Sequence, residues 1–352
     1  MLIFLLFILI TSKIVKNNEE YLSIKYTNVI KGIFLFLVFF RHLVQYNLSF
    51  SNKWIDNIGL KIDSNLGQLI VTLFLFYSGY GIMESVKRKG KEYINNLPRK
   101  RILPTLIHFD VAVIVFIIVT VYMGLEKLSV KQIILSLLGW KTYGNSNWYI
   151  FCIIILYSIA FLSLKAFKDN KSRIISILIG TILYTMVCKW YRPDYVYNTA
   201  FCFVLGIIYS MYKTKIESWV KNREILSFIY LLALFIVAYN LKRNIIWYYI
   251  HTLVFTLIVI IITRKIKIKN FILEWMGKNL FPLYIFQRLP MIVLNEIKYM
   301  KENPYIFFIV AFISTIIITI IYNLIIFLWE KEKKKVLKNR KEKRQKDSYQ
   351  TA

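Results

Sequence analysis

The stretch Asn28–Tyr46 reads Asn-Val-Ile-Lys-Gly-Ile-Phe-Leu-Phe-Leu-Val-Phe-Phe-Arg-His-Leu-Val-Gln-Tyr, an apolar run of membrane-spanning length with Lys31 near its start and Arg41 and His42 deep inside it. In a helix of about 3.6 residues per turn, Lys31 and His42 are about three turns apart, so they share one face and lie roughly 16 Å apart along the axis. Ionisable groups inside a membrane-spanning helix are costly, and they usually face a protein interior or a water-filled cavity. We therefore expect the other helices to surround this face.

The composition excludes an ordinary soluble protein. Of the 352 residues, 57% are hydrophobic, and the mean hydropathy is +0.53. Apolar runs repeatedly approach the length of about 20 residues that a transmembrane helix needs, and they are continuous rather than alternating, which argues against a barrel. The sequence therefore predicts an all-α polytopic membrane protein, because a helix satisfies its own backbone hydrogen bonds in lipid.

Ten apolar segments are candidate membrane spans: Ile30–Leu48, Leu66–Met83, Ile102–Leu125, Trp148–Leu164, Ile174–Trp190, Asn198–Tyr212, Ile225–Tyr239, Ile245–Thr263, Leu280–Leu294 and Tyr305–Trp329. Met1–Ile10 predicts a short additional helix that extends to about Val15, and its length leaves open whether it crosses the membrane. Leu128–Trp140 has helical spacing but is too short to span, so we expect it to lie in the membrane interface. The predicted fold is a bundle of about ten transmembrane helices plus the short N-terminal helix.

The net charge of +28 could indicate nucleic-acid binding in a soluble protein, but here most Lys and Arg residues lie in the loops between the predicted spans and in the C-terminal tail. The loops of one side and the tail 330–352 hold 33 of the 47 Lys and Arg residues, and the loops of the other side hold 10. By the positive-inside rule, this predicts a multi-pass protein of the cytoplasmic membrane with a cytoplasmic C-terminus and no nucleic-acid partner. Residues 1–27 form an N-terminal hydrophobic segment and linker, residues 28–329 the transmembrane domain, and the basic tail an anchor near anionic lipid of the bilayer.

His42 is the first candidate for chemistry. Gln45 and Tyr46 follow it on the same helical face, where they could hydrogen-bond the imidazole or a substrate hydroxyl. Histidine is the side chain best suited to accept a proton near neutral pH, although a lone histidine in a membrane helix is often a structural residue. The sequence contains neither a hydrolytic pair of carboxylates near His42 nor a serine nucleophile elbow.

Two further motifs could serve a substrate. Arg99, Lys100 and Arg101 stand where the third span begins, and they could hold phosphate groups, although most such clusters only set the orientation of a helix. The motif Leu73–Gly81 contains small residues that indicate close helix packing, and Ser78 within it could present a hydroxyl to a cavity.

The remaining polar residues of the spans are expected to be structural. His108 and His251 lie on apolar faces, and Asp110 lies on the opposite side of its helix from His108. The three cysteines lack the spacing of metal ligands, so we expect them to be packing residues: Cys152, Cys188 and Cys202. The sequence predicts no metal site and no tightly bound cofactor.

Taken in order, several motifs resemble those of membrane acyltransferase family 3, the bacterial integral-membrane O-acyltransferases. The resemblance covers roughly Asn28–Trp329 and rests on Lys31-Gly32-Ile33 with His42, Leu73–Tyr80, Arg101-Ile102-Leu103-Pro104, Asn147-Trp148-Tyr149-Ile150, Phe203 with Gly206, and Gly277-Lys278-Asn279-Leu280 with Leu283-Tyr284. It implies a ten-helix acyltransferase core in which His42 is essential for acyl transfer and Lys31 and Arg101 contact acyl-CoA or substrate.

The chain departs from the family pattern at several positions, and within Leu73–Tyr80 Leu75 stands in place of a second Phe. Lys31 replaces the usual Arg, which keeps the charge but loses the bidentate fork. Pro98 occupies the earlier position of a basic pair, so Arg99 or Lys100 would have to supply the missing positive charge. Leu280 replaces a serine, and Gln287 replaces a histidine that varies within the family.

The resemblance and the candidate residues together predict an acyl-CoA-dependent O-acyltransferase, most simply an O-acetyltransferase. Acetyl-CoA would be the donor, and a glycan of the cell envelope or an exported glycan would be the acceptor, with His42 as general base. The alternative is a transporter or flippase of a lipid-linked glycan, but the sequence lacks the inverted repeats and paired broken helices that are frequent in transporters.

Overall fold

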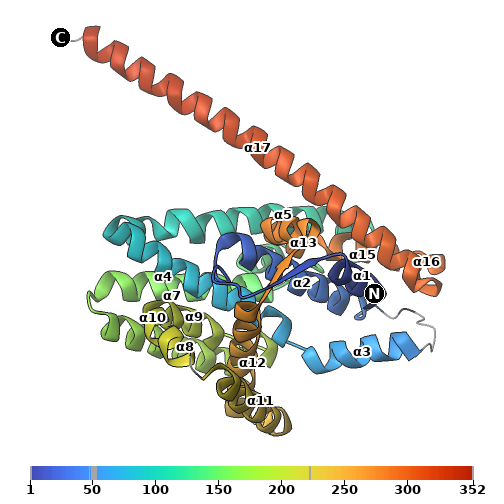
Figure 1. Cartoon of the computed structure of the whole chain (residues 1–352). Coiled ribbons are helices and arrows are strands. Elements are labelled where there is room, and N and C mark those ends of the chain that lie inside the picture. The colour runs from blue at the N-terminus through green and yellow to red at the C-terminus, as the bar shows by residue number, and fades with distance from the viewer. Residues whose placement is uncertain (1, 47, 49–53, 222, 351–352) are drawn as a thin grey trace.

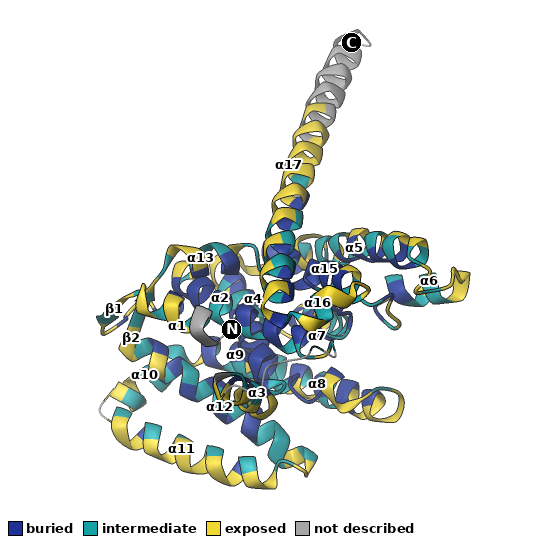
Figure 2. Cartoon of the chain, turned by 90° about the vertical axis from the view of Figure 1, so that its right-hand side faces the viewer, coloured by how far each residue is buried: buried dark blue, intermediate teal, exposed yellow. Residues whose placement is uncertain are grey.

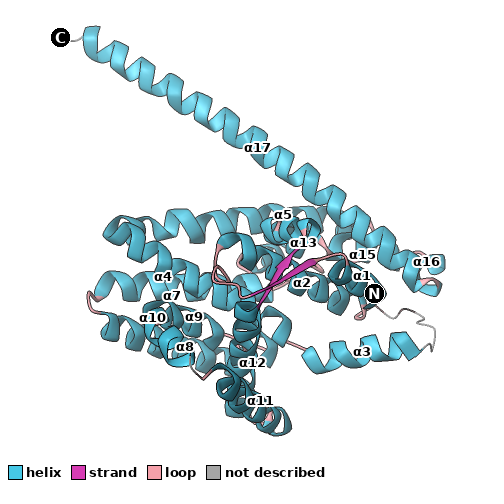
Figure 3. Ribbon diagram, viewed as in Figure 1, coloured by secondary structure: helices cyan, strands magenta, loops and turns pink. Residues whose placement is uncertain are grey.

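The chain is almost entirely helical, with one small two-stranded sheet (Figures 1 and 3). The computed structural model describes residues 2–46, 48, 54–221 and 223–350, and within them it does not describe the side chains of residues 2–4, 55, 334 and 336–350. The elements are α1 (Leu2–Ile10), β1 (Lys13–Lys16), α2 (Ile24–Leu43), α3 (Trp54–Leu66), α4 (Leu69–Leu97), the π-helix η1 (Pro98–Ile102), α5 (Leu103–Tyr122), α6 (Val130–Leu137), α7 (Trp148–Ala166), α8 (Asn170–Tyr191), the 3-10 helix η2 (Asp194–Val196), α9 (Phe201–Met211), α10 (Lys213–Lys221), α11 (Glu224–Leu241), α12 (Ile245–Lys265), β2 (Ile266–Lys269), α13 (Phe271–Lys278), α14 (Leu280–Phe286), α15 (Arg288–Asn295), α16 (Lys298–Glu302) and α17 (Pro304–Gln350).

The predicted class of all-α membrane protein agrees with this architecture, but the predicted number of about ten spans is not confirmed. In the described part of the chain, six helices are long and apolar enough to cross a membrane, or up to seven if the bent pair formed by η2–α9 and α10 is one span. The continuous run Leu69–Tyr122 contains two of the predicted spans, and Gly90 interrupts its helical geometry with φ of 55°. α2 is not among the six, although it is 20 residues long.

α2 lies at the centre of the molecule, and glycines bring its neighbours close to it. A Cβ atom on Gly32 of α2 would clash with the carbonyl oxygen of Leu273 in α13, and one on Gly277 would clash with the carbonyl oxygen of Asn28. The two helices therefore cross in direct backbone contact, which places Asn28–Gly32 of α2 against Leu273–Gly277 of α13.

α4 and α9 approach each other in the same way. A Cβ atom on Gly79 of α4 would clash with the carbonyl oxygen of Phe203, and one on Gly206 of α9 would clash with the carbonyl oxygen of Phe76. The prediction that Leu73–Gly81 is a site of close helix packing is thus confirmed, and the large aromatic side chains between these helices are fully buried.

The N-terminal prediction was wrong in one respect. The helix α1 ends at Ile10, and β1 follows it instead of a helix that extends to Val15. β1 pairs antiparallel with β2, with Lys13 opposite Lys269 and Lys16 opposite Ile266 (Figure 3). Both strands combine Lys with β-branched residues, as Lys-Ile-Val-Lys in β1 and Ile-Lys-Ile-Lys in β2. The two strands lie some 250 residues apart in the sequence, so no local pattern predicts the pairing.

Two peripheral helices complete the fold. The predicted amphipathic segment at Leu128–Trp140 forms the short helix α6, with exposed apolar side chains such as Val130 and Ile134. α17 continues far beyond the predicted span that ends at Trp329 and projects from the body of the molecule (Figure 2). Its sequence contains no proline after Pro304 and no glycine, so nothing in it ends the helix before the basic tail.

Candidate active site

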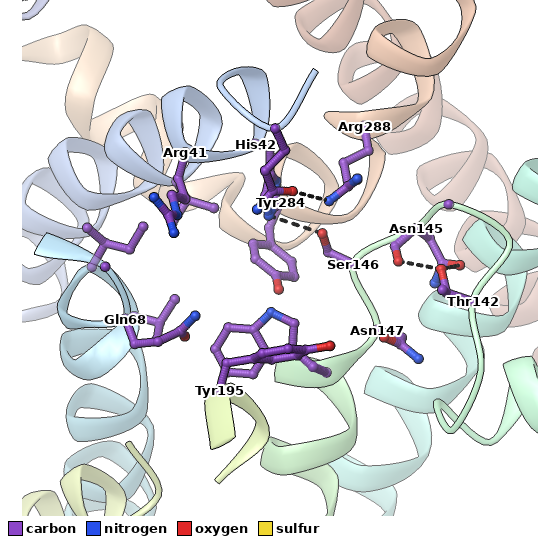
Figure 4. A pocket seen from close by; sticks show the side chains of 17 residues that line it. Arg41, His42, Gln68, Thr142, Asn145, Ser146, Asn147, Tyr195, Tyr284 and Arg288 are labelled. Atoms are coloured by element: carbon purple, nitrogen blue, oxygen red, sulfur yellow. Dashed lines mark hydrogen bonds between the residues drawn. The ribbon is translucent and has the colours of Figure 1, made fainter. Parts of the chain in front are cut away.

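His42 lies near the end of α2 in the wall of a cavity of about 360 Å³, which we name the His42 pocket (Figure 4). The imidazole is 6% exposed, and its Nε2 is 3.2 Å from the hydroxyl oxygen of Ser146, just before α7. The Nδ1 atom is buried and has no hydrogen-bond partner among the described residues. A neutral imidazole in this position can therefore exchange a proton with a hydroxyl that lies where Ser146 lies.

Polar loop residues form one wall of the His42 pocket. Thr142 donates a hydrogen bond to the side-chain carbonyl of Asn145, with 2.9 Å between the two oxygens, and both residues line the cavity beside Ser146 and Asn147 (Figure 4). Asn147 anchors this loop because its amide nitrogen donates to the backbone oxygen of Gly139 at 2.8 Å. The loop is thus held rigidly against the start of α7, which fixes the position of the Ser146 hydroxyl.

Aromatic rings and an ion pair form the opposite side of the His42 pocket. Trp148 and Tyr195 lie edge to face with ring centroids 6.1 Å apart, and both line the cavity. Arg41 also lines it and forms an ion pair with Asp63 of α3, with 2.6 Å between Nη1 and Oδ2. Burial raises the pKa of the Asp63 carboxyl, and the Arg41 guanidinium opposes that shift.

Arg288 is the second cation of the His42 pocket. Its Nη1 donates a hydrogen bond to the side-chain oxygen of Gln45 at 2.7 Å, and its guanidinium lies 5.6 Å from the ring centroid of Tyr46. Arg288 opens α15, directly after Gln287, where α14 ends. The break between two short helices therefore turns this side chain towards the end of α2.

A second and larger cavity, of about 770 Å³, lies along the first half of α2. We name it the Lys31 pocket. Its lining includes four cations, Lys31, Arg88, Arg101 and Lys278, and the hydroxyl-bearing Ser78. The Nε of Arg101 donates to the hydroxyl of Tyr93 at 3.2 Å, and Nζ of Lys31 lies 5.6 Å from the ring centroid of Tyr77. The lining thus combines four cations and one carboxylate, that of Glu84, with aromatic walls.

Tyr284 of α14 lines both pockets. Its ring centroid is 6.3 Å from that of His42 on one side and 5.4 Å from that of Tyr149, which lines the Lys31 pocket, on the other. The Tyr284 hydroxyl is buried and has no hydrogen-bond partner among the described residues. Tyr284 is thus the one residue that the linings of the two described cavities share.

The structure places the predicted site residues in three groups. His42 and Gln45 line the His42 pocket, and Lys31, Ser78 and Arg101 line the Lys31 pocket. Three predicted residues line neither of these two pockets: Arg99, Lys100 and Tyr46. Lys100 lies 3.9 Å from a carboxylate oxygen of Glu92. Arg99 and Arg101 are both exposed, but of the basic cluster only Arg101 lines one of these two pockets.

The other two histidines of the spans line neither pocket and contact aromatic side chains. A ring nitrogen of His108 is 2.6 Å from the hydroxyl of Tyr322, and His251 stacks on Phe235 with centroids 4.6 Å apart. All three cysteines are buried free thiols. In the described ranges, no group of three or more His, Cys, Asp and Glu residues is arranged to hold a metal ion.

Sequence reasoning did not assign several residues that complete the site: Gln68, Asn145, Ser146, Trp148, Tyr149, Tyr195, Tyr284 and Arg288. Trp148, Tyr149 and Tyr284 belong to motifs that carry the family resemblance, so those motifs could have indicated them as site residues. Ser146 and Arg288 had no such signal, because each reaches His42 or Gln45 only through the tertiary fold.

The fold and the site define a helical membrane protein in which two polar pockets meet at one tyrosine. A family model of the acyltransferase domain matches residues 24–324, which includes every residue of both pockets except Leu22 and Ser23. The chain belongs to acyltransferase family 3, and it is a membrane acyltransferase. No curated protein and no solved structure matches it significantly.

Proposed function

We propose that the protein transfers an acyl group, most simply acetyl, from acyl-CoA to a hydroxyl of a cell-envelope or exported glycan, with His42 as general base. The observation that carries this proposal is the position of Tyr284, which lines both the cationic Lys31 pocket and the pocket of His42. A donor in one pocket and an acceptor in the other would meet beside the imidazole.

The Lys31 pocket is the proposed donor site. Coenzyme A carries several phosphate charges, and Lys31, Arg88, Arg101 and Lys278 supply positive charge around one cavity. The thioester would then extend along the aromatic wall towards Tyr149 and Tyr284. This cavity would open to the cytoplasm, where the positive-inside rule places the start of α2 and the C-terminus.

The His42 pocket is the proposed acceptor site. Ser146 marks the position of a hydroxyl in hydrogen-bond range of Nε2, so an acceptor hydroxyl that takes its place would give its proton to that nitrogen. The acceptor oxygen forms the new ester bond to the acyl carbon, and the bond from that carbon to the CoA sulfur breaks. The proton on His42 then leaves with the CoA thiolate or with solvent.

A cell-based experiment tests the function and separates it from transport. A strain that lacks the protein is complemented with wild type, His42→Ala or His251→Gln, and acetyl esters and total polysaccharide are measured at the cell surface. We expect His42→Ala to abolish the esters without reducing the polysaccharide. His251→Gln is the matched control, because His251 is buried but lines neither pocket.

Other results would count against the proposal. Full acetylation with His42→Ala in normal amounts in the membrane would exclude the catalytic role of His42. Loss of the polysaccharide itself in the deletion strain would favour a transporter or flippase of a lipid-linked glycan.

A further inference from the structure

The lining of the His42 pocket has an excess of positive charge. Arg41 and Arg288 both line it, and no Asp or Glu is among its lining residues. Arg41 is compensated by Asp63 just outside the cavity, at 2.6 Å. Arg288 forms no ion pair with any described carboxylate, and residues 47 and 49–53, which are not described, include no acidic residue.

The contacts of Arg288 do not neutralise its charge. Its Nη1 donates to Gln45, a neutral amide, and its Nε is buried without a hydrogen-bond partner. The amide nitrogen of Asn145, which lines the same cavity, is also buried and without a partner among the described residues. A half-buried cation without a counter-charge and a buried donor without an acceptor, both in one cavity, are costly, and an anionic group bound there would remove that cost.

The rest of the lining suits a sugar ring. Trp148 and Tyr195 present aromatic surfaces to the cavity, and Gln68, Thr142 and Asn147 add neutral hydrogen-bonding groups. Binding sites for small polar ligands typically combine aromatic walls with a few polar groups that fix orientation. The pocket therefore combines a platform for a carbohydrate with one cation that lacks a counter-charge (Figure 4).

We propose that the acceptor is an acidic sugar, whose carboxylate or phosphate binds Arg288 while the hydroxyl to be acylated faces His42. This inference rests on the proposed function, since it names the class of acceptor for the same pocket. Arginine suits the task because its planar guanidinium can donate two parallel hydrogen bonds to a carboxylate or a phosphate. Arg288 is thus a specificity-determining residue for the acceptor.

Binding of matched probes to the purified full-length protein tests the proposal. The probes are methyl glucuronide, glucose 6-phosphate and methyl glucoside, and tryptophan fluorescence and calorimetry report binding at low and high salt. We expect wild type to bind an acidic probe at least about tenfold more tightly than the glucoside, and added salt to reduce that preference. The two acidic probes separate a carboxylate acceptor from a phosphate acceptor.

Three variants assign the preference to Arg288. Arg288→Gln should bind all probes with similar affinity, Arg288→Lys should keep part of the preference, and Arg243→Gln should behave as wild type because Arg243 is exposed and lines neither pocket. Equal or undetectable binding of acidic and neutral probes by wild type would overturn the proposal. A preference that survives Arg288→Gln would also overturn it.

Acetyl transfer from labelled acetyl-CoA to the same probes keeps the two proposals distinguishable. If neutral and acidic sugars are acetylated at equal rates, the acyltransferase function stands and the acidic acceptor does not. If acidic probes bind through Arg288 but receive no acetyl group, the acceptor class stands and the proposed donor or reaction is wrong.

Discussion

Lys31 and His42 lie on the same helix, α2, yet they line two different cavities that have Tyr284 in common. Their spacing of about three turns is what allows one helix to serve both cavities. A donor that binds near Lys31 and an acceptor that binds near His42 would therefore approach from opposite ends of α2. On the proposed function, the acyl group would pass between the two sites beside Tyr284.

The first prediction concerns the donor. Arg101→Gln should raise the KM for acetyl-CoA by about tenfold or more, because a hydrogen bond to a charged group contributes about 1.5–3 kcal/mol. Steady-state kinetics in proteoliposomes measures this, with Arg99→Gln as the matched control. Arg99 belongs to the same basic cluster and is exposed like Arg101, but it lines neither pocket, so its variant should stay within about twofold of wild type. Equal effects of both changes would mean that the cluster acts only through its general charge.

The second prediction concerns the side chain between the pockets. Tyr284→Phe should transfer acetyl at close to the wild-type rate, because the hydroxyl has no hydrogen-bond partner among the described residues and the ring is retained. Tyr284→Leu should lose transfer while its affinity for CoA changes little, since the ring that contacts both His42 and Tyr149 is gone. Paired measurements of transfer rate and CoA binding check this. A large loss with Tyr284→Phe would instead give the hydroxyl a part in the chemistry.

The third prediction separates direct transfer from a covalent intermediate. If Ser146 only occupies the place of the acceptor hydroxyl, Ser146→Ala should retain at least about a third of the transfer rate, because the incoming hydroxyl replaces it as the partner of Nε2. The rate of acetyl transfer by the purified variant measures this. A loss of about a thousandfold, together with an acetyl group found on Ser146 of wild type by mass spectrometry, would establish an acyl-serine intermediate.

The fourth prediction concerns the packing that holds the Lys31 pocket in shape. Gly206→Ala should destabilise the protein by about 1–3 kcal/mol, because its Cβ would clash with backbone atoms of Phe76 and Tyr80. Gly81→Ala on the neighbouring helix meets no atom within 4 Å, so it should be neutral or slightly stabilising. Thermal unfolding in detergent compares the two. Equal melting temperatures for both variants would mean that α4 and α9 do not approach as closely as the backbone contact at Gly206 requires.

Much of this fold follows from local sequence patterns. The long apolar runs predict helices at the positions where they occur, and the small residues of Leu73–Gly81 predict the contact between α4 and α9. The spacing of Lys31 and His42 also predicts that α2 faces polar cavities along its length. These features are readable because they depend on residues within a few helical turns of one another.

The remainder depends on contacts between distant parts of the chain. β1 pairs with a strand some 250 residues away, and Ser146 meets His42 across about a hundred residues, so neither contact leaves a local signal. The number of membrane spans is equally hard to predict from the sequence. Hydropathy alone shows neither the break at Gly90, where φ is 55°, nor the bend of 82° between η2–α9 and α10.

The central claim is that donor binding and proton transfer occupy different pockets, with His42 responsible only for the second. The most direct test measures both properties on purified His42→Ala: the dissociation constant for CoA and the rate of acetyl transfer from labelled acetyl-CoA. We expect CoA binding within about threefold of wild type and a transfer rate lower by about a hundredfold to ten-thousandfold, the usual contribution of a general base. A variant that transfers acetyl at more than a tenth of the wild-type rate, or that loses CoA binding along with transfer, would contradict the account.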